Sequence, residues 1–482
     1  MKKYIIIPIA IILLFLQSCS DFEKVNTDPN SPVNIDAHLL LTNILFSITS
    51  DEATIGQGTY DMFVGGDMGA GWSQQWCKTQ YNDEERYIPR NGVVRNFWNT
   101  MYYRVLTNSN NMAKLAEKAD NKNLQGIGLI LKAYGFAMLT DVYGDIPFSE
   151  ALSAESGILL PKYDRQEDVY TGILSLLDNA SGLIGPGNGE VPASSDIMYG
   201  GDVTKWKKFA NSLKFRCLMR IADKKPSVAS QLQALATADG MFASNDDEAK
   251  YSYLESTPNP IYNTVIGSNR IEYRVGKPLV DLLESLGDPR LPIYAEVTVS
   301  DGTYKGKPAG YLDPSTAGIT NKNTSGIGSF YLRKDLPAFL MSYSELQFLM
   351  AEARQKGYIS TGTVQQYYEN GVKASFEFNG LSASAAASYL SGLGAFVPAS
   401  ALTQIGNQKY IALYSQGMEA WIEWKRTRIP NLTPAIDGRI STIPFRFTYP
   451  DNEPTINKVN YDAAVAAQGP DLLETKIWWI NY

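Results

Sequence analysis

Flat aromatic residues gather in one short polar stretch of the chain. Residues 71–82 read GWSQQWCKTQYN and hold Trp72, Trp76 and Tyr81 among glutamines, with Tyr87 a few residues further on. Aromatic rings suit the C–H faces of sugars, and neighbouring amides can pair with hydroxyl groups. The pattern favours a sugar-binding surface. The alternative is that these rings pack the stretch against the body of the protein.

Catalytic motifs are missing from the rest of the sequence. His38 is the only histidine and no Gly-x-Ser-x-Gly motif accompanies it, which argues against a Ser-His-Asp or Cys-His mechanism. One histidine and scattered cysteines cannot supply a usual zinc site. The sequence also lacks a phosphate-binding Gly-x-x-x-x-Gly-Lys-Ser/Thr motif. We predict no catalytic residue, no metal site and no cofactor; calcium stays open, although no Asp-x-Asp-x-Asp loop is present.

Glycoside hydrolysis is the enzyme class hardest to exclude, because two carboxylates suffice for it and the chain has 50 acidic residues. Asp83, Glu84 and Glu85 form an acidic cluster close to the aromatic stretch. Adjacent side chains point in different directions on any regular element. We therefore interpret this run as a solvated face.

The N-terminus has the pattern of an export signal ending at a cysteine. Lys2 and Lys3 precede an apolar block from 4 to 16, which is shorter than the about 20 residues that span a bilayer. The residues LQSC at 16–19 look like a bacterial lipobox, which predicts a covalent lipid on Cys19 as a membrane anchor. The alternative is a cysteine that happens to lie near an ordinary cleavage site.

Charge and cysteine content narrow the class of protein further. The net charge of −7 argues against nucleic acid, whose binding depends on Lys and Arg. With Cys19 carrying lipid, only Cys77 and Cys217 remain, so the chain is not a disulfide framework. One bridge between them stays open, but Cys217 lies in an apolar helical pattern and is predicted to be a buried thiol.

Helical periodicity recurs in pairs along the chain and predicts a mainly α fold with few short strands. Each helix hairpin has an apolar face that it cannot bury alone, so neighbouring hairpins must stack, as in tetratricopeptide repeats. The predicted helical stretches are 98–116 with 124–138, 169–177 with 206–221, 341–354 with 364–376, and 402–425.

Irregular blocks separate these pairs. They are rich in Gly, Asn, Pro, Ser and aromatic residues, and long irregular segments usually carry function. We predict a signal peptide at 1–18, a lipid-bearing tether at 19–35, and a single domain at 36–482 that contains irregular blocks near 56–95, 255–335 and 427–470.

Eight short strings, in one order, resemble the SusD/RagB family of nutrient-binding outer-membrane lipoproteins of Bacteroidetes. The resemblance covers almost the whole chain. The strings are the NTDPN tether at 26–30 after Cys19, LTDVYGDIPFSEAL at 139–152, DPRL at 288–291, YSELQFLMAEA at 343–353, QKYIAL at 408–413, EAW at 419–421 with KRT at 425–427, IPFRF at 443–447 with YP at 449–450, and WW at 478–479.

The resemblance implies a stack of tetratricopeptide-like helix pairs that supports a loop-rich ligand-binding region. It implies a lipid-anchored protein on the outer face of the outer membrane, where it delivers glycans or peptides to a SusC-like TonB-dependent transporter. Asp21 and Glu23 match only partly the acidic surface-export signal of these bacteria. The motif residues themselves read as structural, and we expect Glu419 to pair with Arg426 or Arg428 as a staple.

In sugar-binding relatives, aromatic platforms come from regions that correspond here to 60–90 and about 255–275. No motif allows a transfer residue by residue. From composition and position, the candidate substrate-binding residues are Trp72, Gln75, Trp76 and Tyr81, with Tyr262 and Asn263 opposite. Two other hypotheses stay open. They are a surface glycoside hydrolase, and a structural or adhesion scaffold without an aromatic-lined concavity.

Overall fold

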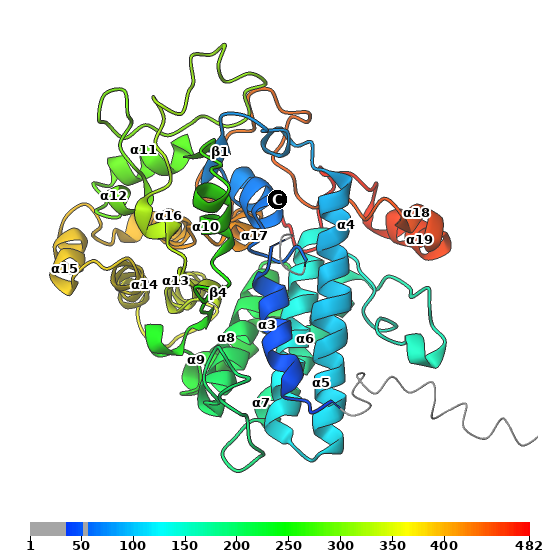
Figure 1. Cartoon of the computed structure of the whole chain (residues 1–482). Coiled ribbons are helices and arrows are strands. Elements are labelled where there is room, and N and C mark those ends of the chain that lie inside the picture. The colour runs from blue at the N-terminus through cyan, green and yellow to red at the C-terminus, as the bar shows by residue number, and fades with distance from the viewer. Residues whose placement is uncertain (1–34, 52–55) are drawn as a thin grey trace, which may run out of the picture.

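The computed structural model describes residues 35–51 and 56–482. The expected signal peptide, the cysteine predicted to carry lipid, Cys19, and almost all of the expected tether lie outside the described residues. Within them, helices dominate and strands are few and short, so the mainly α fold class is confirmed (Figure 1). No helix in this part of the chain is both long and apolar enough to cross a membrane.

The first predicted helical pair forms one side of the molecule. α4 (Asn91–Asn99), the π-helical segment η3 (Thr100–Leu106) and α5 (Thr107–Lys118) follow one another without a break and form a single rod (Figure 1). α6 (Lys122–Tyr143) packs against α5 after a short turn, so the two run antiparallel. α3 (Leu39–Thr49) lies along η3 and α5.

The other predicted pairs are helical as well. α7 packs against both α6 and α8, and α13 packs against α14 and α16. The helices concerned, with their neighbours, are α7 (Gln166–Leu183), α8 (Val203–Ile221), α9 (Ala229–Thr237), α13 (Tyr343–Gln355), α14 (Val364–Phe378), α15 (Ala383–Ser391), α16 (Ala401–Ala412) and α17 (Gly417–Thr427).

The block 427–470 is more helical than expected. It contains α18 (Glu453–Ile456) and α19 (Lys458–Gln468). Ala464 of α19 is buried, and Tyr461 and Val465 pack against the core. The expectation of little helix is wrong here, because three apolar positions on one face of a short polar helix give only a weak periodic signal.

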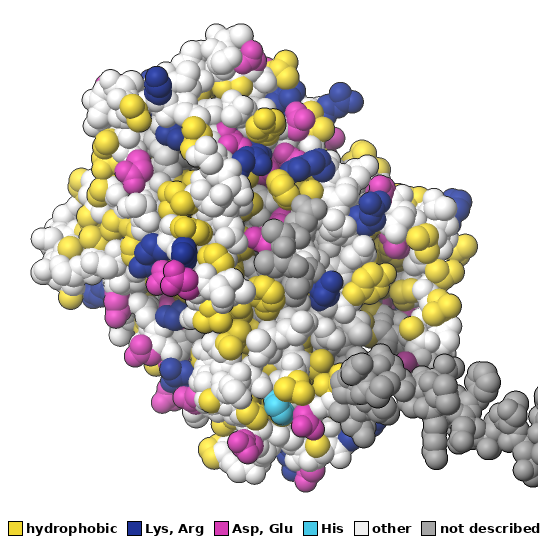
Figure 2. Space-filling model, in the orientation of Figure 1, with side chains coloured by type: hydrophobic (Ala, Val, Ile, Leu, Met, Phe, Trp, Pro, Cys, Tyr) yellow, Lys and Arg dark blue, Asp and Glu magenta, His cyan; other side chains and the backbone are white. Residues whose placement is uncertain are grey.

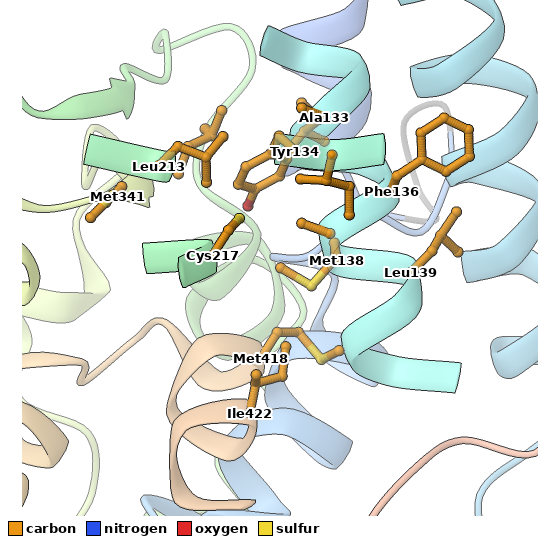
Figure 3. Close-up of a cluster of buried hydrophobic side chains, with 14 of the residues drawn as sticks. Ala133, Tyr134, Phe136, Met138, Leu139, Leu213, Cys217, Met341, Met418 and Ile422 are labelled. Atoms are coloured by element: carbon orange, nitrogen blue, oxygen red, sulfur yellow. The ribbon is translucent and has the colours of Figure 1, made fainter. Parts of the chain in front are cut away.

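Side chains from distant parts of the sequence meet in the core (Figure 3). Tyr134 and Met138 of α6 lie beside Leu213 and Cys217 of α8, with Met418 of α17 below them in this view. Cys217 and Cys77 are both free and buried, which confirms Cys217 as a buried thiol. Burial raises the pKa of the Cys217 thiol to about 12, so the thiol stays protonated at neutral pH.

Buried ion pairs join the helices. Glu419 of α17 contacts Arg220 of α8 at 2.5 Å, whereas Arg426 of α17 contacts Glu352 of α13. The expected pairing of Glu419 with Arg426 or Arg428 is therefore wrong. Glu419 and Arg426 have partners on other helices, and the Arg428 guanidinium lies 4.0 Å from the ring centroid of Trp424. Although burial opposes ionisation, Arg426 holds the pKa of Glu352 down at about 2.

Glycines allow the π-helical segment η1 (Met62–Ala70) to approach α17 backbone to backbone. A Cβ atom added to Gly69 would lie 2.6 Å from the Gly417 carbonyl carbon, and one added to Gly417 would lie 2.0 Å from the Gly65 oxygen. These distances are far below van der Waals contact. The contact fixes η1, which begins the first irregular block, on the helical body.

The described residues contain two short antiparallel strand pairs, one of which connects two irregular blocks. β1 (Trp76–Lys78) pairs with β3 (Tyr273–Val275), with Trp76 opposite Val275 and Lys78 opposite Tyr273. β2 (Ala249–Tyr251) pairs with β4 (Ala338–Met341). The β1–β3 pair brings the blocks 56–95 and 255–335 side by side. Nearby lie η2 (Glu84–Arg86), α10 (Pro260–Tyr262), η7 (Asn263–Gly267), α11 (Lys277–Ser285), α12 (Leu291–Tyr294) and η8 (Ser329–Leu332).

Candidate functional site

A surface hollow of about 550 Å³ lies where the first two irregular blocks meet. Both blocks contribute to it, and the β1–β3 pair holds them together. In Figure 2, basic and hydrophobic side chains lie next to one another on the upper part of the face shown, over the β1 region of Figure 1. The lining residues are Phe63, Lys78, Tyr81, Asp83, Glu84, Ile88, Pro89, Arg90 and Arg270.

Two aromatic rings in the hollow each lie against the guanidinium of an arginine. Tyr81 is 68% exposed, and the Arg270 guanidinium lies 5.3 Å from its ring centroid. The Arg90 guanidinium lies 4.1 Å from the ring centroid of Phe63. A cation–π contact orients the ring and the guanidinium relative to each other. Together the two pairs offer flat apolar surface beside strong hydrogen-bond donors.

The backbone at Tyr81 is unusual. Its φ angle of 55° lies in the left-handed region, which bulky residues rarely adopt. Strained backbone of this kind gathers at functional sites. The turn presents the ring of Tyr81 to solvent beside Arg270.

Carboxylates hold both arginines in place. Arg270 is paired with Glu272, which is buried, and Arg90 is paired with Glu84, also buried. Because the carboxylate of each pair is buried, the arginine side chains are already restrained and lose less conformational entropy when a ligand binds. Both arginines keep further N–H donors for a ligand.

A buried acid lies beneath the hollow. Asp67 accepts hydrogen bonds from Lys78 Nζ at 2.8 Å and from the Tyr273 hydroxyl at 2.7 Å. Burial raises the pKa of Asp67 to about 6, against the opposing charge of Lys78. This network ties η1, β1 and β3 together under the lining residues.

Three of the predicted binding residues lie inside the protein. Trp72 is fully buried and donates its Nε1–H to the Glu84 carbonyl at 2.8 Å. Trp76 is 3% exposed, with its ring edge-on to Tyr414 at 5.9 Å. Gln75 is buried and donates to the Tyr410 carbonyl at 2.8 Å. These side chains join the loop block to the helical body, which is the alternative that the sequence left open.

The remaining candidates lie at or near the surface. Tyr81 lines the hollow, whereas Tyr262 and Asn263 are half-buried and do not. Asn263 donates to the Pro258 carbonyl at 3.3 Å. They lie in the consecutive short helices α10 and η7, and η7 helps to position Arg270, because the Arg270 N–H donates to the Thr264 carbonyl at 3.2 Å.

Phe63, Arg90 and Arg270 were not foreseen as site residues. They lie within the two blocks that the sequence marked as functional, but nothing in their local pattern separates them from their neighbours. The one sequence signal that could have identified the two arginines is their position at the ends of these aromatic, turn-rich stretches.

The acidic cluster is structural. Glu84 and Glu85 are buried and only Asp83 is well exposed, so the interpretation of this run as a solvated face is wrong for two of its three residues. Glu85 accepts hydrogen bonds from the Lys78 N–H at 2.7 Å and from Lys307 Nζ at 2.7 Å. Lys307 lies in the second block, so Glu85 is another tie between the blocks.

The polar groups of the hollow are mostly engaged in ion pairs. Its two carboxylates, Asp83 and Glu84, are ion-paired with Arg86 and Arg90. Within residues 35–51 and 56–482 no group of three or more His, Cys, Asp or Glu side chains is placed to hold a metal ion. What remains is aromatic surface with arginine donors.

Solved structures share this architecture. A chitin-binding protein is 27% identical, with a TM-score of 0.82 over 92% of this chain and 100% of that one. A chitin-binding SusD homologue from Flavobacterium johnsoniae is 25% identical, with a TM-score of 0.80 over 92% of this chain and 98% of that one. A SusD homologue from Bacteroides uniformis is 24% identical, with a TM-score of 0.82 over 93% of this chain and 100% of that one.

No curated protein matches the sequence. The family comparison agrees with the motif strings and with the solved structures. A model of the SusD-like family, described as starch-binding and associating with the outer membrane, matches residues 29–450, and the chain belongs to this family.

Proposed function

We propose that the protein is a non-catalytic cell-surface lipoprotein that captures nutrient oligosaccharides and passes them to a SusC-like TonB-dependent transporter. A lipid on Cys19 holds it on the exterior of the outer membrane. The ligand binds in the hollow lined by Tyr81, Arg270, Phe63 and Arg90, and no cofactor takes part. The observation that carries this proposal is the exposed ring of Tyr81, which lies beside the Arg270 guanidinium where the two irregular blocks meet.

The size and chemistry of the hollow suit a few sugar units. A volume of about 550 Å³ falls within the range of about 300–1,000 Å³ of small-molecule sites. The face of a sugar ring can stack on Tyr81, and the guanidinium of Arg270 can donate to its hydroxyl or acetamido oxygens. Two of the similar proteins are described as chitin-binding, which supports a glycan ligand over a peptide.

Binding without turnover is favoured over glycoside hydrolysis. A hydrolase needs one carboxylic acid and one free carboxylate about 5–10 Å apart. At this hollow Asp83 and Glu84 are each ion-paired, and Asp67 is buried beneath Lys78 and Tyr273. A purely structural scaffold is disfavoured because an exposed aromatic hollow is present.

Calorimetry with chitin and starch oligosaccharides tests the proposal on the protein that lacks residues 1–19. We expect Tyr81→Ala to weaken binding about fivefold, because stacking on one ring contributes on the order of 1 kcal/mol. Arg270→Ala should weaken binding by a similar factor, since it removes hydrogen-bond donors and the support of the ring.

Tyr103→Ala is the matched control. Tyr103 is 70% exposed and lies in η3 of the helical rod, so its loss should leave the affinity unchanged. Equal affinities for the parent protein and Tyr81→Ala would contradict this binding site. Release of reducing ends from the bound glycan would instead favour the hydrolase.

A further inference from the structure

A second hollow, of about 470 Å³, lies on the helical part of the molecule and shares no lining residue with the Tyr81 hollow. It is bounded by α5, α6, α7 and the loop 148–156. Lys114 of α5 and Lys132 of α6 both line it. Its volume falls within the range of small-ligand sites.

Lys132 has no carboxylate partner among the described residues. It is half-buried, and the contact found for its Nζ is a hydrogen bond to Asn110 Oδ1 at 2.9 Å. Burial, together with the positive charge of Lys114, lowers the pKa of Lys132. A half-buried ammonium group with only an amide partner is costly, and in an acidic protein this cost calls for an explanation.

The nearby acids do not neutralise Lys132. Glu155 pairs with Lys114 at 3.3 Å, but its side chain is 83% exposed, so this contact is weak and easily exchanged. Asp164 does not line the hollow, and its oxygens accept hydrogen bonds from the N–H and hydroxyl of Ser149 at 2.7 and 2.8 Å. An anion that entered between the two lysines would meet two ammonium groups.

The remaining walls suit a sugar. Phe148 lines the hollow, and its ring rests on Gly172, where an added Cβ would lie 2.2 Å from the ring. It also packs edge-on against Phe136, with the ring centroids 4.6 Å apart. Ser153, Ser156 and Ser175 also line the hollow, and serine hydroxyl groups can bond to sugar hydroxyls.

We propose that this second hollow binds an anionic sugar unit, with its carboxylate or sulfate ester between Lys132 and Lys114 and its ring against Phe148. The protein then holds two glycan sites of different chemistry. The site at Tyr81 is built for uncharged sugar faces, and the site at Lys132 selects for negative charge.

Calorimetry on the protein without residues 1–19 compares three probes: digalacturonic acid, galactose 6-sulfate and neutral galactobiose. We expect at least one anionic probe to bind tenfold or more tightly than galactobiose. Lys132→Gln should reduce that affinity to the level of the neutral sugar, and raising NaCl should weaken binding of the anionic probe. The anionic probe that binds identifies the group as a carboxylate or a sulfate ester.

Two control variants test whether binding of the anionic probe depends on this hollow. Lys224→Gln removes an exposed lysine just beyond α8 and should not change the affinity. Tyr81→Ala should not change it either, so this proposal can fail or succeed independently of the first site. Lys132→Gln keeps a donor for Asn110, and an unchanged melting temperature checks its folding. The proposal is overturned if neither anionic probe binds more tightly than galactobiose, or if Lys132→Gln binds the preferred probe as well as the parent.

Discussion

Glu248 is a buried carboxyl group immediately before β2, and it connects that strand to α13. It accepts hydrogen bonds from the Tyr343 N–H at 3.0 Å and from Lys250 Nζ at 3.3 Å. Burial raises the pKa of Glu248 to about 7, although Lys250 opposes the shift. The folded protein therefore binds this proton more tightly than the unfolded chain does, and the resulting stabilisation is complete below about pH 4.5 and lost as the pH rises through 7.

We expect Glu248→Gln to remove this loss, because glutamine is uncharged at every pH and can still accept from Tyr343. Relative to the parent, the variant should gain up to about 3 kcal/mol in free energy of unfolding between pH 4.5 and 8. Urea unfolding at several pH values measures the difference. Two pH profiles that run parallel would show that Glu248 does not titrate in this range.

At the residue scale the sequence predicted which blocks lie together, but not which of their side chains are exposed. The blocks 60–90 and 255–275 do meet, yet Trp72 and Trp76 face inward and Tyr81 outward. In a regular strand or helix, periodicity tells which side chains share a face, but an irregular loop has no period to read. Ion-pair partners such as Glu419 and Arg220 could not be predicted either, because about 200 residues separate them and local sequence patterns do not show such distant contacts.

At the scale of elements, the paired helices were predictable because their apolar residues recur with a helical period, whereas α18 and α19 were not. The contact between η1 and α17 was not, because it depends on how closely two backbones approach. That contact can be tested with glycine substitutions that differ only in their surroundings.

Gly417→Ala should strongly destabilise the protein, because the added methyl group meets the Gly65 oxygen and the Ala70 nitrogen at 2.0 and 2.5 Å. Backbone cannot yield as a flexible side chain can, so we expect a loss of several kcal/mol. Gly182→Ala, in α7 with no atom within 4 Å of the added methyl group, is the matched control. It should stabilise by up to about 1 kcal/mol. Similar melting temperatures for the two variants would show that η1 can move away from α17.

At the scale of the whole molecule, the helix stack provides a frame, and in our proposal the irregular blocks provide the binding surface. The strand pair β1–β3, the Asp67 network and the Glu85–Lys307 contact all tie the first block to the second. Periodicity and motif order were enough to predict the helical frame.

The proposed anchoring also belongs to this scale. We expect Cys19→Ser to release the mature polypeptide from outer-membrane vesicles, because the acyl chains are the only membrane attachment that the proposal includes. Sedimentation of vesicles followed by immunodetection measures the bound fraction, with the parent chain as control. A variant that still sediments with the vesicles would mean that another contact holds it there.

The buried tryptophans have a practical consequence for spectroscopy. Trp72, Trp76, Trp98, Trp206, Trp421, Trp424 and Trp479 are each at most 7% exposed, and the ring at the mouth of the Tyr81 hollow is a tyrosine. The fluorescence of the indole groups should therefore shift to longer wavelength when the protein melts and stay almost silent when a glycan arrives. A ligand titration that follows tryptophan emission would therefore report unfolding of the protein but would not report binding of the glycan.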